Sequence, residues 1–591
     1  MGYPWHQLPA WRVLDTDFGS GQTFLSTWNA WQQDAGRPRT LHYVALCEQP
    51  CGAQDLIAGC ATMPALATLA RELAAQWFGL LPGFHRFSLA RGQVVLTLCV
   101  GEPLGMLRAQ QFEADAVELC AKQLGTADSS WFLKALARCC RRGTTLYLRG
   151  QNDESSADET ELRATLTRNG FTFTSNDTRD WQSAPAQPRG HFDPPWVLKH
   201  SRQGAALAAL PIERCAVIGA GLAGASVAAA LARRGWQVHV LDLASEPAAG
   251  ASGLPVGLVV PHVSSDDCTL SRLSRAGARL MLQQACQLLE INQDWAPSGV
   301  LERQVGGTPK LPQVWPPSGE QWCEDFSDSD IAGQLGPGIW HQQGAWIKPA
   351  ALVNAWLLQP GVTFQPHAEV TDIRHADGIW ELLDATGTAL CRAERVVFAN
   401  ACGAFHLLHK MKLLKPDLYG LWEHLPATQG MRGLLNWDFH QGPIDASFPP
   451  FPVNGSGSVV PRIPVGGELA WFMGSSYQPQ SQPERSDMIN QANNFKHLEQ
   501  LLPPLARHLA PAFATNTLKT WKNTRCVTAD RLPAVGPLQV AEQPGLWLCA
   551  GMGSRGLSFS VLCAELLAAR FGAEPLPIEA KLARSLEALR A

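Results

Sequence analysis

The sequence predicts an α/β fold in two domains. Two observations lead to this class: strand-like apolar runs alternate with helical patterns in both halves of the chain, and a Gly-rich turn joins a strand to a helix in the second half. The length of 591 residues allows about two to four domains of ordinary size. We expect one domain at 1–185, a linker at 186–211 and a second domain at 212–591.

In the first half, strand-like runs at 41–46, 94–100 and 144–148 alternate with helical patterns at 65–78 and 131–140. Helical crossovers usually join parallel strands, so we expect a Rossmann-like domain with a parallel sheet. Between Ser175 and Pro211, prolines lie among polar residues with little apolar periodicity. Such a composition is typical of a linker.

The second half opens with a strand at 215–218, a Gly-rich turn, an Ala-rich helix that ends near Arg234, and a second strand at 237–243. This order predicts a βαβ unit. Short strands bounded by Gly and Pro, with a helical stretch at 270–291, predict an inserted mixed-sheet domain. A strand at 546–550, another Gly-rich turn and a helix at 557–571 close the chain.

The first Gly-rich turn reads G-x-G-x-x-G at Gly219, Gly221 and Gly224, between the strand and the helix of the βαβ unit. In this context, Gly219 permits the tight turn, Gly221 lets the backbone approach a pyrophosphate, and Gly224 allows close packing of helix on strand. Asp242, at the end of the second strand, can accept hydrogen bonds from ribose hydroxyls. The motif therefore predicts a dinucleotide site.

Composition excludes several other classes. The 48 Lys and Arg residues against 52 Asp and Glu argue against a globally basic nucleic-acid-binding surface. Residues 215–232 carry no charge, but their glycines follow the dinucleotide spacing, so we expect no membrane helix. The first residues lack a basic segment followed by an apolar one, so we expect a cytoplasmic protein. No C-x-x-C pair is present, and we expect no metal site.

Three further segments resemble the D-amino-acid oxidase superfamily, in its glycine-oxidase-like form. They are Gly250-Ala251-Ser252-Gly253, the strand and turn at 395–403, and Gly551-Met552-Gly553-Ser554-Arg555-Gly556. In that superfamily, the last strand-turn-helix returns to the first βαβ unit and closes over the flavin. The resemblance implies FAD as cofactor, with contacts at Ser252, Gly253, Gly553, Ser554 and Gly556 beside those of the first turn.

Two arginines are candidate catalytic residues. Arg525 resembles the superfamily arginine that pairs with a substrate carboxylate over the flavin, and the guanidinium fork suits this bidentate contact. A structural ion pair is the alternative for Arg525. Arg555 lies in the closing turn, where it could contact flavin or substrate.

Segments between these motifs resemble one bacterial family, the bifunctional tRNA 5-methylaminomethyl-2-thiouridine biosynthesis proteins. They are residues 344–349, 474–477, 530–536 and 551–565. In the first half, Phe18-Gly19-Ser20-Gly21, followed by an aromatic helix, resembles the S-adenosylmethionine-binding entry of that family. The resemblance implies a methyltransferase domain at 1–185 and an FAD-dependent oxidoreductase domain at 212–591.

The resemblance also implies two consecutive reactions on the wobble uridine of tRNA. The FAD-dependent half oxidatively removes the carboxymethyl group of 5-carboxymethylaminomethyl(-2-thio)uridine-34, which leaves 5-aminomethyl(-2-thio)uridine. The other half then methylates the new amine with S-adenosylmethionine. The alternative is an FAD-dependent glycine or secondary-amine oxidase fused to an inactive methyltransferase-like domain. A separate alternative, for residues 1–185 alone, is a non-enzymatic module that holds tRNA or serves packing.

The first half departs from the family pattern at several positions. The resemblance assigns S-adenosylmethionine contacts to Gly19, Gly21 and Glu102, but Asp17 stands where the family has glycine, and the candidate catalytic aspartate is replaced by Cys120. A carboxylate hinders close approach of a cofactor to the turn. The sequence is therefore compatible with an active methyltransferase and with a domain that keeps the fold but has reduced or no transferase activity.

The implied partner, tRNA, needs local rather than global positive charge. Candidate basic clusters are Arg138, Arg141 and Arg142, then Lys410, Lys412 and Lys415, and then Lys519, Lys522 and Arg525. With a net charge of -4, we expect modest tRNA binding that falls steeply with salt.

Overall fold

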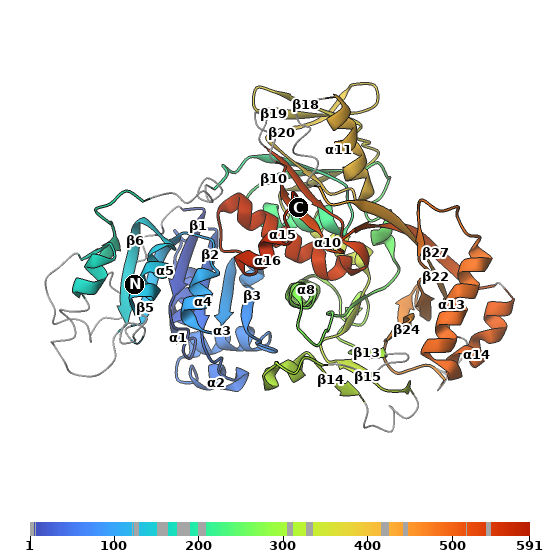
Figure 1. Ribbon diagram of the computed structural model, residues 1–591, viewed down its shortest axis with the longest axis horizontal. Helices are drawn as coiled ribbons and strands as arrows, with labels where there is room; N and C mark the ends of the chain where they lie inside the picture. Colours follow the sequence, from blue (N-terminus) through green and yellow to red (C-terminus); the bar gives the residue numbers. More distant parts are fainter. Residues whose placement is uncertain are drawn as a thin grey trace. The chain divides into compact units, whose positions relative to one another are not determined.

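The structure is a computed structural model that describes residues 5, 8–120, 122, 129–149, 163–173, 190–198, 209–303, 311–326, 335–414, 425–440, 447–515, 517–538 and 545–590. The chain divides into two compact units. Unit 1 comprises Met1–Pro211 with Ala568–Arg584, and unit 2 comprises Ile212–Leu567 with Ser585–Ala591 (Figure 1). The segment 568–584, which we expected in the second domain, therefore groups with the first.

Unit 1 is built on an eight-stranded sheet in the order β3-β4-β2-β1-β5-β6-β8-β7. The strands are β1 (Ala10–Asp15), β2 (Thr40–Cys47), β3 (Gly83–Leu89), β4 (Val94–Val100), β5 (Ala114–Cys120), β6 (Cys140–Arg149), β7 (Phe171–Phe173) and β8 (Gly190–Phe192). The five central strands are parallel, while β3, β7 and β8 pair antiparallel at the two edges. The predicted Rossmann-like sheet is confirmed, with antiparallel edges that the sequence did not indicate.

Both faces of this sheet are covered by helices. Val13 and Leu14 are adjacent in β1 and belong to different hydrophobic clusters, because successive side chains of a strand point to opposite faces. The Val13 cluster includes buried residues of α1 (Gln22–Gln33), α2 (Ala53–Ala58) and α3 (Pro64–Ala74), and the Leu14 cluster those of α4 (Pro103–Arg108) and α5 (Ser129–Ala137). This burial makes a two-sided core.

Part of the expected linker is structured. Strand β8 falls inside 186–211 and pairs with β6 and β7, and Phe192 is 1% exposed. Burial of Phe192 stabilises this short strand, which the proline-rich composition of the segment did not predict. Within this stretch, the structure describes residues 190–198 and 209–211.

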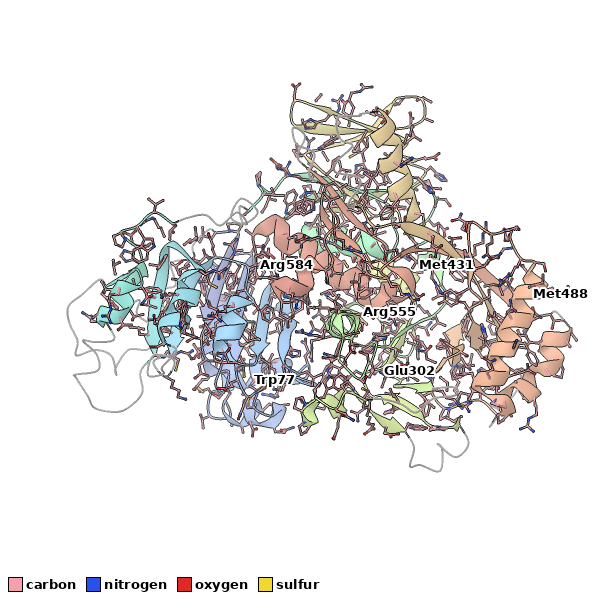
Figure 2. The ribbon with its side chains drawn as sticks, in the orientation of Figure 1. Trp77, Glu302, Met431, Met488, Arg555 and Arg584 are labelled. Atoms are coloured by element: carbon pink, nitrogen blue, oxygen red, sulfur yellow. The ribbon has the colours of Figure 1, made fainter. Side chains whose placement is uncertain are left out.

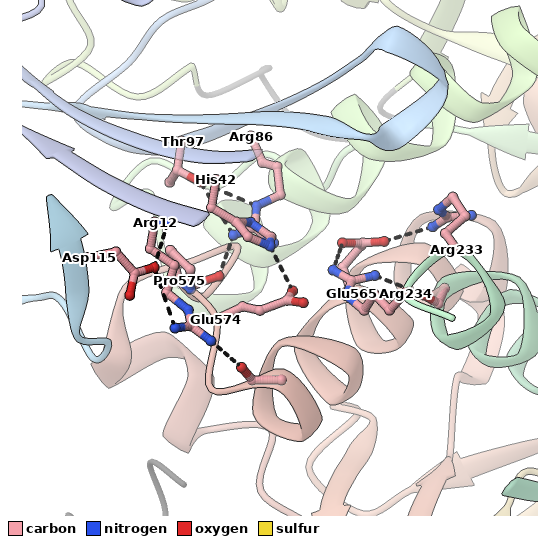
Figure 3. A network of polar contacts seen from close by, with 12 residues as sticks. Arg12, His42, Arg86, Thr97, Asp115, Arg233, Arg234, Glu565, Glu574 and Pro575 are labelled. Carbon is pink, nitrogen blue, oxygen red and sulfur yellow. Dashed lines mark hydrogen bonds and ion pairs between the residues drawn. The ribbon is translucent and has the colours of Figure 1, made fainter. Parts of the chain in front are cut away.

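The segment 568–584, which includes α16 (Ala580–Arg584), completes unit 1 through polar contacts (Figure 3). His42 Nε2 lies 3.3 Å from Glu574 Oε2, and both side chains are almost fully buried. Arg86 donates to the carbonyl oxygen of Pro575, and Arg12 donates to that of Gly572 at 2.8 Å. These contacts join residues that are about 500 positions apart in the chain.

Unit 2 contains a six-stranded sheet in the order β17-β10-β9-β21-β29-β28, parallel except for β28. The strands are β9 (Arg214–Ile218), β10 (Gln237–Leu241), β17 (Val362–Gln365), β21 (Arg395–Phe398), β28 (Ala534–Pro537) and β29 (Leu546–Ala550). Helix α7 (Leu222–Arg233) connects β9 to β10. The predicted βαβ opening is confirmed, and the last predicted strand, β29, pairs with β21 in the same sheet.

A nine-stranded mixed sheet forms the second layer of unit 2, in the order β14-β15-β13-β23-β24-β25-β22-β26, with β27 on β22. Its strands are β13 (Val300–Arg303), β14 (Cys323–Phe326), β15 (Gly338–His341), β22 (Thr428–Phe439), β23 (Val453–Gly455), β24 (Gly457–Val465), β25 (Glu468–Gly474), β26 (Gln478–Pro479) and β27 (Lys519–Thr528). This sheet is the predicted inserted domain.

Two three-stranded sheets and six further α-helices occur among the described residues of unit 2 and its boundary. The sheets are β11 (Gly257–Val259) with β16 (Ala345–Ile347) and β12 (Trp295–Ala296), and β18 (Asp372–Ala376) with β19 (Ile379–Leu383) and β20 (Ala389–Ala393). The helices beside α7 are α8 (Thr269–Leu288), α10 (Pro349–Leu357), α11 (Cys402–Leu414), α13 (Asp487–Leu501), α14 (Pro503–Ala514) and α15 (Gly556–Gly572). Among the residues described, none of the helices combines the length and hydropathy needed to cross a membrane.

Candidate flavin and substrate site

The Gly-rich turn at the end of β9 requires glycine for steric reasons. Gly219 has φ +106°, and a Cβ there would lie 2.8 Å from the Asn400 Cα. A Cβ on Gly224 would lie 1.8 Å from the carbonyl oxygen of Gly219, so only glycine lets α7 pack this closely on the turn. The predicted roles of Gly219 in the turn and Gly224 in helix packing match this geometry.

Asp242 and Ser252 hold the loops around this turn. Asp242 accepts hydrogen bonds from the N–H groups of Ala220 at 2.7 Å and Ala244 at 2.9 Å. Ser252 Oγ accepts from the N–H of Leu222, the first residue of α7, at 2.9 Å. The Ser252 hydroxyl therefore lies at the helix N-terminus, where a pyrophosphate is favoured by free N–H groups and the helix dipole.

A cavity of about 850 Å³ extends from this turn to the mixed sheet. Its lining includes most of the predicted unit 2 site residues: Gly219, Gly221, Asp242, Ser252, Arg525, Gly553, Ser554, Arg555 and Gly556. Gly224 and Gly253 are not among the lining residues. A Cβ on Gly253 would meet the Ala248 carbonyl oxygen at 2.7 Å, so Gly253 serves close packing of its loop.

The residues of the cavity fit FAD. A Cβ on Gly221 would point at Ser252 Oγ, only 2.9 Å away, so the missing side chain leaves a cradle between the turn and the hydroxyl. Asp242, at the end of β10, lies where the ribose would bind, and the cavity volume is at the upper end of the range for small-molecule sites.

At the other end of the cavity, Arg525 is held by two hydroxyl groups. Its Nη1 donates to the Tyr477 hydroxyl at 2.7 Å and to Ser475 Oγ at 3.4 Å. The Tyr477 hydroxyl also lies 3.2 Å from Ser554 Oγ of the closing turn. Arg525 thus has hydroxyl partners rather than a carboxylate, and the alternative of a structural ion pair finds no support among the described residues.

Tyr477 was not singled out in the sequence, although the segment 474–477 was. Enclosure by the cavity raises its pKa, but the positive charge of Arg525 and hydrogen bonds with Ser554 and Ser475 outweigh this effect, so the pKa of Tyr477 lies below its ordinary value of 10.0. A phenol of this kind is a strong hydrogen-bond donor. The Arg525 and Tyr477 pair is therefore suited to bind a carboxylate.

Arg555 shares the cavity with a carboxylate that the sequence did not reveal, Glu302 of β13. His341 Nε2 lies 2.9 Å from Glu302 Oε2, and His341 is 1% exposed, whereas the Glu302 side chain is 29% exposed. Burial raises the pKa of Glu302, but the hydrogen bond with His341 and the positive charges of His341, His262 and Arg555 bring it below its ordinary value. Glu302 therefore faces the cavity as a carboxylate.

In unit 1, the turn after β1 has the expected glycines. Gly19 and Gly21 have φ +53° and +77°, and a Cβ on Gly21 would lie 2.8 Å from the Phe18 ring. Arg149, at the end of β6, spans this turn: it pairs with Asp15 and donates to the Asp17 carbonyl oxygen at 2.9 Å and to Thr23 Oγ1 at 2.7 Å. Arg149 therefore links the Gly-rich turn after β1 to the end of β6.

The remaining predicted residues of unit 1 have other contacts. Glu102 caps α4 by accepting from the N–H groups of Leu104 at 2.7 Å and Gly105 at 2.6 Å. Cys120 ends β5, and its N–H donates to Thr16 Oγ1 at 2.8 Å. Ala121, Gln123 and Leu124, which belong to the predicted catalytic segment, lie outside the described residues.

Buried carboxylates line the same strand ends. Burial raises the pKa of Asp15 to about 6, although Arg149 opposes this. Burial and the charge of Asp15 raise the pKa of Glu118 to about 8. These two acids and Arg149 were not predicted, because no motif brings β1, β5 and β6 together before the sheet forms.

The predicted basic clusters are partly neutralised. Arg141 pairs with Asp115, Arg142 with Asp193, and Lys522 with Asp487 and Glu484. Lys519 lies over the rings of Trp437 and Phe439. Lys415 and the side chain of Lys412 lie outside the described residues.

Known proteins resemble the chain over its whole length. The family model "FAD dependent oxidoreductase" matches residues 214–570. A tRNA 5-methylaminomethyl-2-thiouridine biosynthesis bifunctional protein MnmC from Albidiferax ferrireducens is 52% identical over 99% of this chain and 94% of its own, and one from Polaromonas naphthalenivorans is 43% identical over 98% and 90%. Among solved structures, glycine oxidase from Geobacillus kaustophilus has a TM-score of 0.47 at 18% identity, over 61% of this chain and 95% of its own.

The two relatives cover both halves of the chain, and the family model covers most of unit 2. The predicted fold class and FAD cofactor are confirmed. The chain belongs to the family of tRNA 5-methylaminomethyl-2-thiouridine biosynthesis bifunctional proteins, MnmC, and its residues 214–570 form an FAD-dependent oxidoreductase.

Proposed function

We propose that the chain modifies the wobble uridine of tRNA. Its oxidoreductase half removes the carboxymethyl group of 5-carboxymethylaminomethyl(-2-thio)uridine-34 and leaves 5-aminomethyl(-2-thio)uridine and glyoxylate. The observation that carries this proposal is the Arg525 and Tyr477 pair, which lies in the same cavity as the dinucleotide turn. A cytoplasmic location, where tRNA is found, is part of the same proposal.

The reaction is an oxidation of a substituted glycine. FAD, held by these residues, would supply a two-electron oxidant that takes one hydride from the CH₂ group between the amine and the carboxylate. The C–N bond becomes an imine as the amine loses its proton. Water then adds to the imine carbon, and C–N cleavage releases the aminomethyl nucleoside and glyoxylate.

The residues of the cavity orient the substrate. The Arg525 guanidinium offers two parallel N–H donors to the carboxylate, and the Tyr477 hydroxyl adds a third. Because the carboxylate is bound at one fixed point, the adjacent CH₂ group is restricted in position. Part of the binding energy is therefore used to orient the reacting group. Gly219, Gly221, Asp242 and Ser252 hold the dinucleotide, with Gly553, Ser554 and Gly556 at the closing turn.

The second activity of the family is methylation of the new amine. We assign it to unit 1, with S-adenosylmethionine at Gly19 and Gly21. Arg149 and Asp15 form an ion pair across this turn, and we infer that cofactor binding displaces Arg149 from Asp15.

Mass spectrometry of wobble nucleosides tests the proposal. FAD-loaded protein is incubated with tRNA that carries the carboxymethylaminomethyl group, with and without S-adenosylmethionine. We expect aminomethyluridine without the methyl donor and methylaminomethyluridine with it, whereas tRNA that lacks the group is not turned over. Rapid flavin reduction by free glycine or sarcosine with inert tRNA would instead identify a small-molecule amine oxidase.

A further inference from the structure

We propose that Glu302 and Arg555 form a subsite that reads the hydrogen-bonding edge of a uracil ring, with Glu302 accepting from N3–H and Arg555 donating to the C4 carbonyl oxygen. The inference rests on the proposed function and deepens it. It assigns to this chain the residues that distinguish a modified nucleoside from a free N-alkylglycine.

Both side chains line the same cavity as Arg525, and both come from unit 2. Figure 2 labels Glu302 and Arg555. Glu302 projects from β13 of the mixed sheet, and Arg555 from the closing turn before α15. Glu302 and Arg555 therefore form a second polar part of the cavity lining, which we call the second polar wall, in addition to the Arg525 and Tyr477 pair.

Glu302 and Arg555 each have hydrogen-bonding atoms that make no hydrogen bond within the described part of the chain. His341 occupies Glu302 Oε2, and within the described part of the chain Glu302 Oε1 has no hydrogen-bond partner. The Arg555 guanidinium is half-buried and likewise makes no hydrogen bond or ion pair with a described residue. Glu302 Oε1 and the Arg555 guanidinium are therefore available to pair with a ligand that enters the cavity.

The ligand must supply one donor and one acceptor side by side. The N3–H and C4=O groups of uracil are adjacent on one ring edge and meet this requirement, and a fixed carboxylate with a neighbouring guanidinium is their complement. His341, buried behind the carboxylate, fixes its rotamer and leaves Oε1 directed elsewhere. A freely rotating acid would discriminate less well.

The glycine part of the substrate does not account for this wall. Its carboxylate has the Arg525 fork and the Tyr477 hydroxyl, and a second arginine is not needed for it. The remaining candidate is the amine, which would pair with Glu302 through charge rather than through a neutral hydrogen bond. This alternative makes a different prediction for small substrates.

The test measures the rate of flavin reduction under anaerobic conditions with two probes: an anticodon stem-loop RNA that carries 5-carboxymethylaminomethyluridine, and the same RNA with a methyl group on N3. The FAD-loaded full chain is compared with Glu302→Ala, Glu302→Gln and Arg555→Met. Glu324→Ala, which removes an exposed carboxylate on β14 of the same sheet, is the control.

We expect N3-methylation to lower kcat/KM of the wild type by about tenfold or more, the value of one lost hydrogen bond to a charged group. Glu302→Ala loses a similar factor on the unmethylated RNA and no longer distinguishes the two probes, whereas Glu302→Gln keeps much of the discrimination because its amide oxygen can accept. Arg555→Met lowers kcat/KM for both RNAs, and Glu324→Ala resembles the wild type.

Sarcosine is the reference substrate, because it has the glycine part and no base. Equal losses on sarcosine and RNA in Glu302→Ala would assign Glu302 to the amine and overturn the inference, as would a wild type that reduces its flavin equally fast with both RNAs. If neither RNA reduces the wild-type flavin while sarcosine does, it is the proposed function that fails. Retained FAD absorbance in each variant shows that the fold is intact.

Discussion

The Arg525 guanidinium lies 5.3 Å from the centre of the Tyr477 ring and donates from Nη1 to the Tyr477 hydroxyl at 2.7 Å. The cation over the ring and the hydrogen bond to the hydroxyl restrict both side chains. If substrate binds as we propose, this preorganisation lowers the cost of orienting the carboxylate of a substituted glycine.

Arg525→Met is expected to raise the pKa of Tyr477, because the favourable charge is removed while enclosure by the cavity remains. Tyrosinate absorbance measures this shift, and the chain has only five tyrosines, so subtraction of the Tyr477→Phe titration isolates the signal. Arg525→Met should also slow flavin reduction by modified tRNA more than it weakens tRNA binding. Unchanged reduction rates would remove the carboxylate role.

Gly224→Ala is expected to destabilise unit 2 and reduce FAD retention. The new Cβ would lie 1.8 Å from the Gly219 carbonyl oxygen, so α7 must move away from β9. Thermal unfolding and the flavin absorbance of the purified protein measure both effects. Gly250→Ala is the matched control, since a Cβ there meets nothing within 4 Å. A normal melting temperature in Gly224→Ala would contradict the packing argument.

Arg149→Ala is expected to strengthen binding of S-adenosylmethionine. The wild-type protein must break the ion pair with Asp15 and the hydrogen bonds to Asp17 and Thr23 before the turn is free, and the variant has no such contacts to break. Isothermal calorimetry with the full chain gives both dissociation constants. Tighter binding by the wild type than by Arg149→Ala would show that Arg149 holds the cofactor instead of competing with it.

The stability of unit 1 is expected to fall as pH rises from about 4.5 to 8. The folded pKa of Glu118 is about 8 against an ordinary value of 4.5, so the folded unit holds more protons than the unfolded chain in this range. Its free energy of unfolding therefore decreases with rising pH. Glu118→Gln, which cannot ionise, should flatten the dependence. Hydrogen exchange of peptides from β1, β2 and β5 at several pH values measures it, with unit 2 peptides as internal reference.

Glu574→Ala is expected to destabilise unit 1 by about 1–3 kcal/mol, because it removes the partner of His42 from a site where both side chains are almost fully buried. Lys581→Ala, an exposed change in the same segment, should have little effect. Hydrogen exchange of the peptide that contains β2 reports the difference. A chain that ends after residue 567 should show a larger loss, because the contacts of Arg12 and Arg86 with this segment disappear as well.

Much of the site in unit 2 could be predicted from the sequence because its parts are local. Gly219, Gly221 and Gly224 lie within six residues, and a turn of this geometry accepts only glycine at its crowded positions. Asp242 follows one helix and one strand later, so chain order alone brings it beside the turn. The closing turn at Gly553 was found in the same way.

Only the tertiary structure decided which distant side chains share a cavity or a core. Glu302, His341, Tyr477 and Arg555 come from four separate elements, and no spacing in the chain relates them. The same holds for Arg149 and Asp15, and for His42 and Glu574, which meet because a sheet brings strand ends together and because residues 568–584 group with unit 1. Backbone conformation is fixed by neighbours in the chain, whereas burial and charge pairing are fixed by neighbours in space.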